Sequence, residues 1–288
     1  MKRPIVGLGE VLWDLLPEGP RAGGAPFNFA FHCSQLGHPA IIISRVGNDE
    51  LGQRLLAEVR RLGLTDEFIQ VDLEHPTGTV PIRVDEQGQP SYYFPPEVAW
   101  DFLEWDDRLE SLMRSAAAVC YGTLAQRSPL SRRTILRCVE MAERTALTVC
   151  DLNLRLPFPT AEVIENSLRL ARWVKLNNGE LQELQRILGT AELPDLLAWG
   201  PKLVCITNGE RGSEVFFQNQ IITKYALPIK VVDTVGAGDA FTAGLLTQVL
   251  EGQTRDRATR FATVLAGLVA SRAGGTPFVE RAEVERQC

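Results

Sequence analysis

The chain has 288 residues, of which 45% are hydrophobic and 23% are charged, and its formal net charge at pH 7 is −6. This composition is typical of a globular protein that forms one large domain or two modest ones. Because nucleic-acid binding requires a clustered basic surface, the acidic balance argues against a dedicated nucleic-acid-binding protein.

The hydropathy of the chain argues against export and membrane insertion. Residues 1–14, MKRPIVGLGEVLWD, reach acidic positions too early for a secretory signal peptide. No uninterrupted apolar run approaches the roughly 18 residues of a membrane-spanning helix. We therefore expect a cytoplasmic protein without a membrane partner.

Cysteine and histidine patterns exclude two further kinds of site. The six cysteines include no C-x-x-C pair, and the three histidines show no zinc-ligand spacing. A disulfide framework is unexpected at this chain length in the cytoplasm. The chemistry must therefore depend on carboxylates, backbone amides and bound ions.

Short apolar segments alternate with segments of helical periodicity along the chain. The predicted strands are 4–10, 40–47, 117–122, 146–151, 173–177 and 202–207, and the predicted helices include 26–37, 50–63, 129–145 and 161–172. This alternation predicts an α/β fold with a doubly wound, mostly parallel sheet covered by helices on both faces.

One region departs from this alternation. Residues 76–95 show two alternating strand patterns around a glycine-containing turn, without an intervening helix. Together with a short strand candidate at 11–17, they predict a small β-sheet that projects from the main body. Such an excursion serves either as a lid or as a plain edge hairpin. No linker is apparent, so we expect 1–288 to form one domain.

Residues 231–246, VVDTVGAGDAFTAGLL, place one acidic residue between a glycine-rich turn and an apolar helix. Gly236 and Gly238 permit unusual backbone angles and close approach, so the amides of residues 237–239 are able to converge on one point. Such a turn can stabilise a transferred phosphoryl group, with Asp239 as the general base for a substrate hydroxyl. The alternative is that Asp239 only complements the helix dipole.

Two widely separated segments resemble the signatures of the ribokinase-like (PfkB) carbohydrate kinases. DTVGAGDAF at 233–241 resembles the C-terminal signature, and GGAPFNFAFHCSQLG at 23–37 with SRVGNDELGQRLL at 44–56 resembles the N-terminal one. The resemblance covers nearly the whole chain and implies ATP-dependent sugar phosphorylation. The catalytic residues that it implies are Asp239 as the base and Gly236, Ala237 and Gly238 as the anion hole.

The same resemblance implies residues that contact the sugar. Asp14, in EVLWDLLP, sits where these kinases keep a carboxylate for sugar hydroxyls, and Gly24 and Asn28 belong to the N-terminal signature. DLNLR at 151–155 resembles the D-x-N-x-R of fructokinases and 2-keto-3-deoxygluconate kinases, which implies a role for Arg155.

The nucleotide and ion sites are also implied by family motifs. KLNNGEL matches the N-x-x-E that organises magnesium and phosphate-bound water, ITNGERGS matches the strand and turn over the nucleotide, and ASRAGGTPF matches a loop that often surrounds a monovalent cation. The residues implied are Asn177 and Glu180 for Mg²⁺, Asn177, Thr207, Gly209, Gly212 and Gly238 for ATP, and Asp233, Val235 and Gly274 for K⁺.

The identity of the substrate rests on fewer residues. Gln126 and Arg127 lie in a strand-end loop that is expected to face the sugar. The opening GEVLWDLLP and the D-x-N-x-R stretch favour fructose. A keto acid requires an arginine for its carboxylate, and Arg127 and Arg155 keep that substrate open.

We therefore predict a sugar kinase that phosphorylates a primary hydroxyl, closest in its motifs to a fructokinase. A kinase acting on 2-keto-3-deoxygluconate, ribose or a nucleoside is the nearest alternative, and a non-catalytic sugar- or nucleotide-sensing protein is the alternative from another class. GLGEVL at 7–12 lacks the third glycine of a dinucleotide fingerprint, which argues against a dehydrogenase. Two lids are expected to pair in a homodimer.

Overall fold

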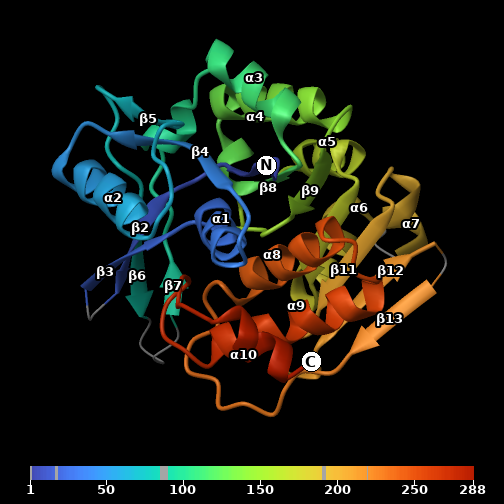
Figure 1. Cartoon of the computed structure of the whole chain (residues 1–288). Coiled ribbons are helices and arrows are strands. Elements are labelled where there is room, and N and C mark those ends of the chain that lie inside the picture. The colour runs from blue at the N-terminus through green and yellow to red at the C-terminus, as the bar shows by residue number, and fades with distance from the viewer. Residues whose placement is uncertain (1, 17–18, 85–89, 190–192, 219) are drawn as a thin grey trace.

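The computed structural model describes residues 2–16, 19–84, 90–189, 193–218 and 220–288. Within these residues, nine strands form one sheet in the order β13-β12-β11-β10-β9-β8-β1-β4-β5 (Figure 1). The strands of this sheet are Ile5–Leu8 (β1), Ala40–Gly47 (β4), Ile69–Asp72 (β5), Ala118–Tyr121 (β8), Leu147–Asp151 (β9), Trp173–Asn177 (β10), Leu203–Thr207 (β11), Ser213–Phe217 (β12) and Gln220–Lys224 (β13).

The sheet is parallel except at one end. Every neighbouring pair from β5 to β11 is parallel, whereas β12 and β13 pair in antiparallel fashion at the edge. Each of the six segments predicted as strands of the parallel sheet contains one of its strands. The structure adds β5 to these six strands. The sequence of β5, IQVD, is too short for its hydropathy pattern to distinguish a strand from a turn.

Helices cover both faces of the sheet, as predicted. Figure 1 shows α1, α8 and α9 together in front of it and α3, α4 and α5 gathered near its upper end. The helices are Ala25–Gln35 (α1), Glu50–Arg61 (α2), Asp107–Ser115 (α3), Pro129–Glu143 (α4), Ala161–Leu170 (α5), Asn178–Leu188 (α6), Leu193–Ala198 (α7), Ala237–Leu250 (α8), Arg255–Ala270 (α9) and Arg281–Arg286 (α10), with short 3₁₀ helices at Ala99–Phe102 (η1), Leu124–Arg127 (η2) and Gly209–Arg211 (η3).

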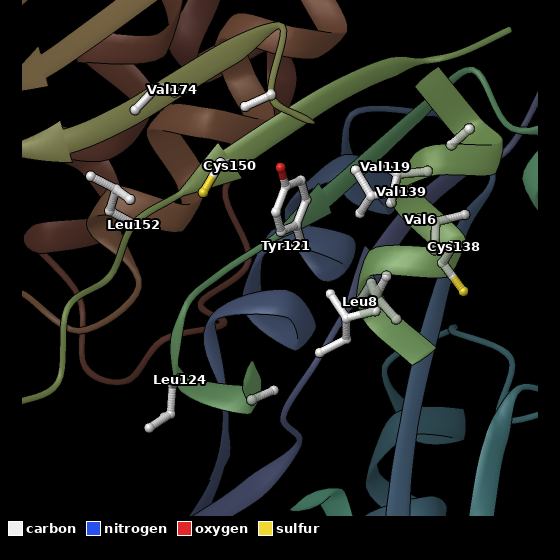
Figure 2. Close-up of a cluster of buried hydrophobic side chains, with 14 of the residues drawn as sticks. Val6, Leu8, Val119, Tyr121, Leu124, Cys138, Val139, Cys150, Leu152 and Val174 are labelled. Carbon is white, nitrogen blue, oxygen red and sulfur yellow. The ribbon is translucent and has the colours of Figure 1, made fainter. Parts of the chain in front are cut away.

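Strand residues alternate between two hydrophobic clusters, one on each face. Ile5 packs with residues of α1, α2 and α8, whereas Val6 and Leu8 pack with residues of α3, α4 and α5. Figure 2 shows part of the second cluster, with Tyr121 at its centre. The hydroxyl of Tyr121 donates a hydrogen bond of 2.8 Å to the carbonyl of Ser167, which satisfies the one polar atom of this ring. Both faces are therefore buried, as a parallel sheet requires.

A second, smaller sheet lies beside the main one, in the order β3-β2-β6-β7. Its strands are Leu12–Leu16 (β2), Gly19–Gly23 (β3), Thr79–Val84 (β6) and Pro90–Tyr92 (β7). β2 pairs in parallel with β6, and the other two pairs are antiparallel. Residues 17 and 85–89 of the predicted segments 11–17 and 76–95 lie outside the described residues.

The strand β3 was not predicted. Its sequence, GPRAG, contains no β-branched or aromatic residue, so its propensity alone indicates a turn. Pairing along the whole of β2, from Leu12 opposite Gly23 to Leu16 opposite Gly19, holds it in the sheet. Tertiary pairing therefore overrides local preference at this position.

Candidate functional site

The predicted site residues gather where parallel strands end and α8 begins. Asp151 is the last residue of β9, and Asn177 and Thr207 are paired at the ends of β10 and β11. Ligands of open parallel sheets bind at this carboxyl edge, because loops and helix N-termini meet there. The first turn of α8, from Ala237, adds its positive end to the same place.

Asp239 lies half-buried in the first turn of α8 and is held from another helix. The side-chain amide of Asn28, in α1, donates a hydrogen bond of 2.9 Å to Oδ2 of Asp239. Burial raises the pKa of Asp239 to about 7, and the nearby carboxylate of Asp151 adds to the rise. This carboxylate changes charge close to neutral pH, as a general base requires.

The turn before Asp239 needs its two glycines for different reasons. Gly236 has a φ of 75° and packs directly against the backbone of Gly275. Gly238 has ordinary helical angles, but a Cβ there would lie 2.6 Å from Nζ of Lys175. Of the two expected reasons for glycine, unusual angles therefore apply at Gly236, and close approach, here of an ammonium group, applies at Gly238.

Two backbone donors of this turn face no acceptor in the protein. The N–H of Ala237 donates to the carbonyl of Thr234 at 3.3 Å, so it is already engaged. Within the described residues, the N–H groups of Gly238 and Asp239 have no hydrogen-bond acceptor, as is usual for the first turn of a helix. Of the predicted residues 237–239, only Gly238 and Asp239 therefore keep backbone N–H groups that are free to bind an anion.

Lys175, in β10, is a residue of this site that the sequence analysis missed. Its Nζ donates a hydrogen bond of 3.0 Å to Oδ1 of Asp151, and both side chains are buried. Burial alone would lower the pKa of Lys175, but the carboxylates of Asp151 and Glu180 raise it above its usual range. The sequence signal was a single lysine inside an otherwise apolar strand.

The predicted sugar-binding carboxylate lies in the smaller sheet. Asp14, in β2, is half-buried and accepts no hydrogen bond from any described residue. Burial raises its pKa to about 6, while the positive charge of Arg155 opposes the rise. Arg155 is exposed, and its positive charge also opposes the rise in the pKa values of Glu10 and Asp239, so it lies within electrostatic range of the acidic groups of the site.

Glu10 and Gly24 connect β1 to the start of α1. Gly24 is the N-cap of α1, with a φ of 109°, and its backbone packs against the carbonyl of Glu10. Glu10 is 2% exposed, and its Oε2 has no hydrogen-bond partner among the described residues. Burial raises the pKa of Glu10 to about 7. Because Gly24 is the N-cap of α1, its close packing against Glu10 fixes the start of the helix that carries Asn28.

Asn177 and Glu180 form the capping box of α6. The N–H of Glu180 donates to Oδ1 of Asn177 at 2.9 Å, and the N–H of Asn177 donates to Oε2 of Glu180 at 2.7 Å. The other oxygen of Glu180 accepts the N–H of Leu154 at 2.8 Å, which anchors the DLNLR stretch. The ordinary capping function of this motif is therefore present whatever else it binds.

At this edge of the sheet, a magnesium ion would have to be held largely by water and by substrate phosphates rather than directly by protein side chains. Among the described residues, no three His, Cys, Asp or Glu side chains are arranged to hold a metal ion. Asn177 and Glu180 are committed to backbone N–H groups, although a carboxylate keeps further lone pairs for water. These donors suit Mg²⁺, which keeps several waters and is held largely by substrate phosphates.

Asp233 joins the two loops of the predicted cation site. Its Oδ1 accepts the N–H of Val235 at 3.0 Å, and its Oδ2 accepts the N–H of Gly274 at 2.8 Å. Nη1 of Arg21, from β3, lies 3.8 Å from Oδ2 of Asp233. The structure thus brings together the three predicted residues and adds an arginine from the smaller sheet.

The predicted nucleotide residues Thr207, Gly209 and Gly212 lie at the end of β11 and in the turn to β12. Gly209 and Gly212 have φ values of 57° and 97°, and the backbone of Gly212 packs against the carbonyl of Lys224. These glycines are therefore required by the turn itself, and Thr207 lies beside Asn177 at the sheet edge.

The side chains of Gln126 and Arg127 are held mainly by contacts within the protein, although Oε1 of Gln126 is buried without a hydrogen-bond partner among the described residues. Nε2 of Gln126 donates to the carbonyl of Gly122 at 2.8 Å and to Oγ of Ser167 at 2.9 Å, in the interior. Gln126 is fully buried, so the side chain is not exposed as a residue facing a sugar is expected to be. A residue at the end of a short 3₁₀ helix can point inward as readily as outward, and the sequence does not separate the two.

Arg127 is committed to the segment that follows the smaller sheet. It forms a buried two-pronged pair with Asp101, with distances of 2.8 and 2.7 Å, and donates to the carbonyls of Phe94 and Pro95. Its guanidinium also stacks 4.1 Å from the ring centre of Trp100. These contacts occupy both N–H edges with which the guanidinium could bind a carboxylate in bidentate fashion, so Arg155 is the arginine of the two that is open to that role.

Residues 19–282 match the pfkB family of carbohydrate kinases. The chain belongs to this family. Fructokinase-2 of Solanum lycopersicum is 29% identical over 309 residues, which cover 96% of this chain and 93% of that protein. The crystal structure of a sugar kinase from Pyrococcus horikoshii, 27% identical, superposes with a TM-score of 0.86 over 98% of this chain and 97% of that one.

The pfkB fold extends over the entire chain. The crystal structure of a Xylella fastidiosa fructokinase with bound ATP superposes with a TM-score of 0.89, at 22% identity, over 100% of this chain and 98% of that one. At this identity the likeness shows the fold alone. In the described part of the chain, no helix is both long and apolar enough to cross a membrane.

Proposed function

We propose that this kinase transfers the γ-phosphoryl group of ATP to a primary hydroxyl of fructose. The observation that carries the proposal is the half-buried Asp239, held by Asn28 at the N-terminus of α8 beside two unpaired backbone donors. Its pKa of about 7 allows it to accept a proton at neutral pH. A carboxylate that only complements the helix dipole would not need this burial or this partner.

Asp239 acts as the general base in this proposal. It accepts the proton of the sugar hydroxyl while the hydroxyl oxygen forms a bond to the γ-phosphorus. The bond from the γ-phosphorus to the bridging oxygen breaks, so the products are a sugar phosphate, ADP and the proton on Asp239. Asn28 keeps Oδ2 of Asp239 engaged and leaves Oδ1 for the hydroxyl.

The turn of residues 236–239 stabilises the transferred group. The N–H groups of Gly238 and Asp239 donate to oxygens of the γ-phosphoryl group, and the helix end adds a favourable potential. Asn177 and Glu180 hold Mg²⁺ largely through water, and Thr207, Gly209 and Gly212 lie along the nucleotide. When bound, Mg²⁺ neutralises charge on the triphosphate.

Known ligands of proteins with this fold support these assignments. An Escherichia coli neighbour was solved with ATP and Mg²⁺, and a Vibrio cholerae fructokinase was solved with fructose, ADP and a potassium ion. We propose that the loops joined by Asp233, Val235 and Gly274 bind K⁺ through backbone carbonyls in this chain as well.

Fructose is favoured over other substrates by two observations. The relatives named fructokinase include the Solanum lycopersicum protein at 29% identity. Asp14 offers a free carboxylate for sugar hydroxyls, and Arg127 is withdrawn from the recognition of a keto acid by its pair with Asp101. Arg155 alone supports the keto-acid alternative, because it is exposed and lies within electrostatic range of the acidic groups of the site.

A substrate panel tests this proposal. Fructose, ribose, 2-keto-3-deoxygluconate and adenosine are each incubated with ATP, and ADP release is measured in a coupled assay. We expect fructose to give the highest kcat/KM and its product to carry phosphate on a primary oxygen. A higher value for 2-keto-3-deoxygluconate would assign the keto-acid substrate, and sugar binding without ADP release would assign a sensor.

A further inference from the structure

The buried ammonium of Lys175 has a position that its pairing with Asp151 does not explain. Lys175 and Asp151 are aligned partners of the parallel strands β10 and β9, and the distance from Nζ to Oδ1 is 3.0 Å. Balancing one buried carboxylate accounts for one of the three N–H bonds of this ammonium. The other two have no acceptor among the described residues.

The ammonium lies directly against the predicted anion-binding turn. A Cβ on Gly238 would lie 2.6 Å from Nζ of Lys175, so the side chain fills the space that glycine leaves open. The hydroxyl of Thr242 lies 3.1 Å from Oδ2 of Asp151 and 3.1 Å from the carbonyl of Gly238. Strand β9, strand β10 and the first turn of α8 are thus tied to one another around the ammonium.

The donors that converge here suit one kind of ligand. The unpaired N–H groups of Gly238 and Asp239 and the two uncommitted N–H bonds of Lys175 are all donors. A buried donor without an acceptor is costly, and a buried cation is the more so. A phosphoryl oxygen, which is negatively charged and has several lone pairs, satisfies all of them.

We propose that Lys175 is a further catalytic residue, whose ammonium donates a hydrogen bond to an oxygen of the γ-phosphoryl group during its transfer. This inference rests on the proposed kinase reaction, and it assigns to Asp151 the positioning of the ammonium. The charge on the γ-phosphoryl oxygens is stabilised by a fixed cation that needs no reorganisation during the reaction.

The first test replaces the ammonium by an apolar chain of similar length. Lys175→Met is expected to lower kcat roughly 10²- to 10³-fold, as for loss of one preorganised donor, with the KM for the sugar little changed. The matched control is Lys202→Met, which makes the same change at an exposed position next to β11 and is expected to keep kcat. An active Lys175→Met variant with near wild-type kcat would overturn the inference.

A second variant separates catalysis from charge balance. If Lys175 only neutralises Asp151, then the double variant Asp151→Asn/Lys175→Met, which leaves no unpaired buried charge, recovers near wild-type kcat, and the inference is wrong. If Lys175 acts on the phosphoryl group, the folded double variant stays at least 10²-fold slower than wild type. The double variant also keeps the test valid where Lys175→Met alone does not fold.

Nucleotide affinity provides a readout that does not depend on turnover. ATP and ADP differ by the γ-phosphoryl group, so Lys175→Met is expected to weaken ATP binding roughly tenfold or more and to leave ADP binding nearly unchanged, as measured by calorimetry. Equal affinity changes for both nucleotides would overturn the inference. The protein could also distinguish ATP from ADP through Lys175 and yet phosphorylate no sugar. That result would contradict the proposed function but not the contact between Lys175 and the γ-phosphoryl group.

Discussion

Around the first turn of α8, buried contacts fix the functional groups, since Asn28 bonds Asp239 and Lys175 bonds Asp151. In the smaller sheet, by contrast, the carboxylate of Asp14 accepts no hydrogen bond from any described residue, so it is free to accept one from a ligand. In the function proposed above, the side that acts on phosphate is therefore preorganised by the protein itself. The side proposed to bind the sugar gains its hydrogen-bond donors only from the sugar, which is why the reaction class is easier to infer than the substrate.

Breaking the preorganised side should have the largest effect. Asp239→Asn removes the base and is expected to lower kcat roughly 10²-fold or more. Since the folded state raises the pKa of Asp239 to about 7, stability from this group is lost as the pH rises through that value. The variant should therefore unfold at an equal or higher Tm than wild type at pH 8. Near wild-type turnover would reduce Asp239 to a helix-dipole residue.

Arg127 fixes the segment that follows the smaller sheet, through its pair with Asp101. Arg127→Met leaves Asp101 buried without its partner and is expected to lower the free energy of unfolding by about 3–5 kcal/mol, measured by denaturant titration. Arg108→Met, which breaks an exposed Arg–Asp pair, is the matched control and should change stability little. A stable Arg127→Met variant with a selectively raised KM for 2-keto-3-deoxygluconate would return Arg127 to the substrate.

Breaking the sugar side should affect binding rather than turnover. Asp14→Ala removes hydrogen bonds from sugar hydroxyls to a charged acceptor, and is expected to raise the KM for the sugar roughly tenfold or more. The KM for ATP should stay within about twofold, because Asp14 belongs to the smaller sheet and not to the turn of α8 or the predicted nucleotide residues. Steady-state kinetics with each substrate varied in turn measures both, and parallel increases would contradict the contrast between the two sides.

The pH profile sharpens the same contrast. Because Asp239 must be ionised to accept a proton and has a pKa of about 7, kcat should fall up to tenfold for each pH unit below that value and level off above it. Asp14→Asn should keep this acidic limb in kcat. A wild-type profile that is flat from about pH 5.5 to pH 8 would exclude Asp239 as the titrating base.

The last prediction concerns the oligomeric state rather than catalysis. Leu15 and Tyr92, on strands of the smaller sheet, are 37% and 51% exposed, and edge strands of such a sheet have unpaired backbone groups. We expect two copies to pair through this sheet, giving a particle of twice 31.9 kDa in light scattering at micromolar concentration. Leu15→Glu should restore the monomer, while a wild-type monomer that sugar and ATP leave unchanged would contradict the pairing.

Sequence patterns were sufficient for six strands of the parallel sheet, but not for β5 or for β3 of the smaller sheet. The predicted segment 173–177 coincides with β10, because buried parallel strands are short apolar runs. The same pattern hides Lys175, whose meaning depends on its alignment with Asp151. Which strands lie side by side is decided by the packing of the whole chain, and no local pattern contains that information.

The site residues divide in the same manner. Asp239 and Asn28 come together from α8 and α1 as the separated signatures imply, since both motifs carry polar groups at the start of buried helices. Gln126 points inward to Ser167, which its sequence context does not indicate, because the direction of one side chain in a 3₁₀ turn depends on its neighbours in space. Arg21, which lies near Asp233, was missed because β3 has the composition of a turn.

The distribution of thiols provides a means to label this kinase at a single native position. Five cysteines are buried, and only Cys288, the last residue of the sequence, is exposed. Burial raises the pKa of buried thiols such as Cys33 and Cys120, which keeps them protonated and slow to react. A maleimide dye therefore attaches at one native position, remote in sequence from Asp14 and Asp239, and reports rotation of the unaltered protein by fluorescence anisotropy.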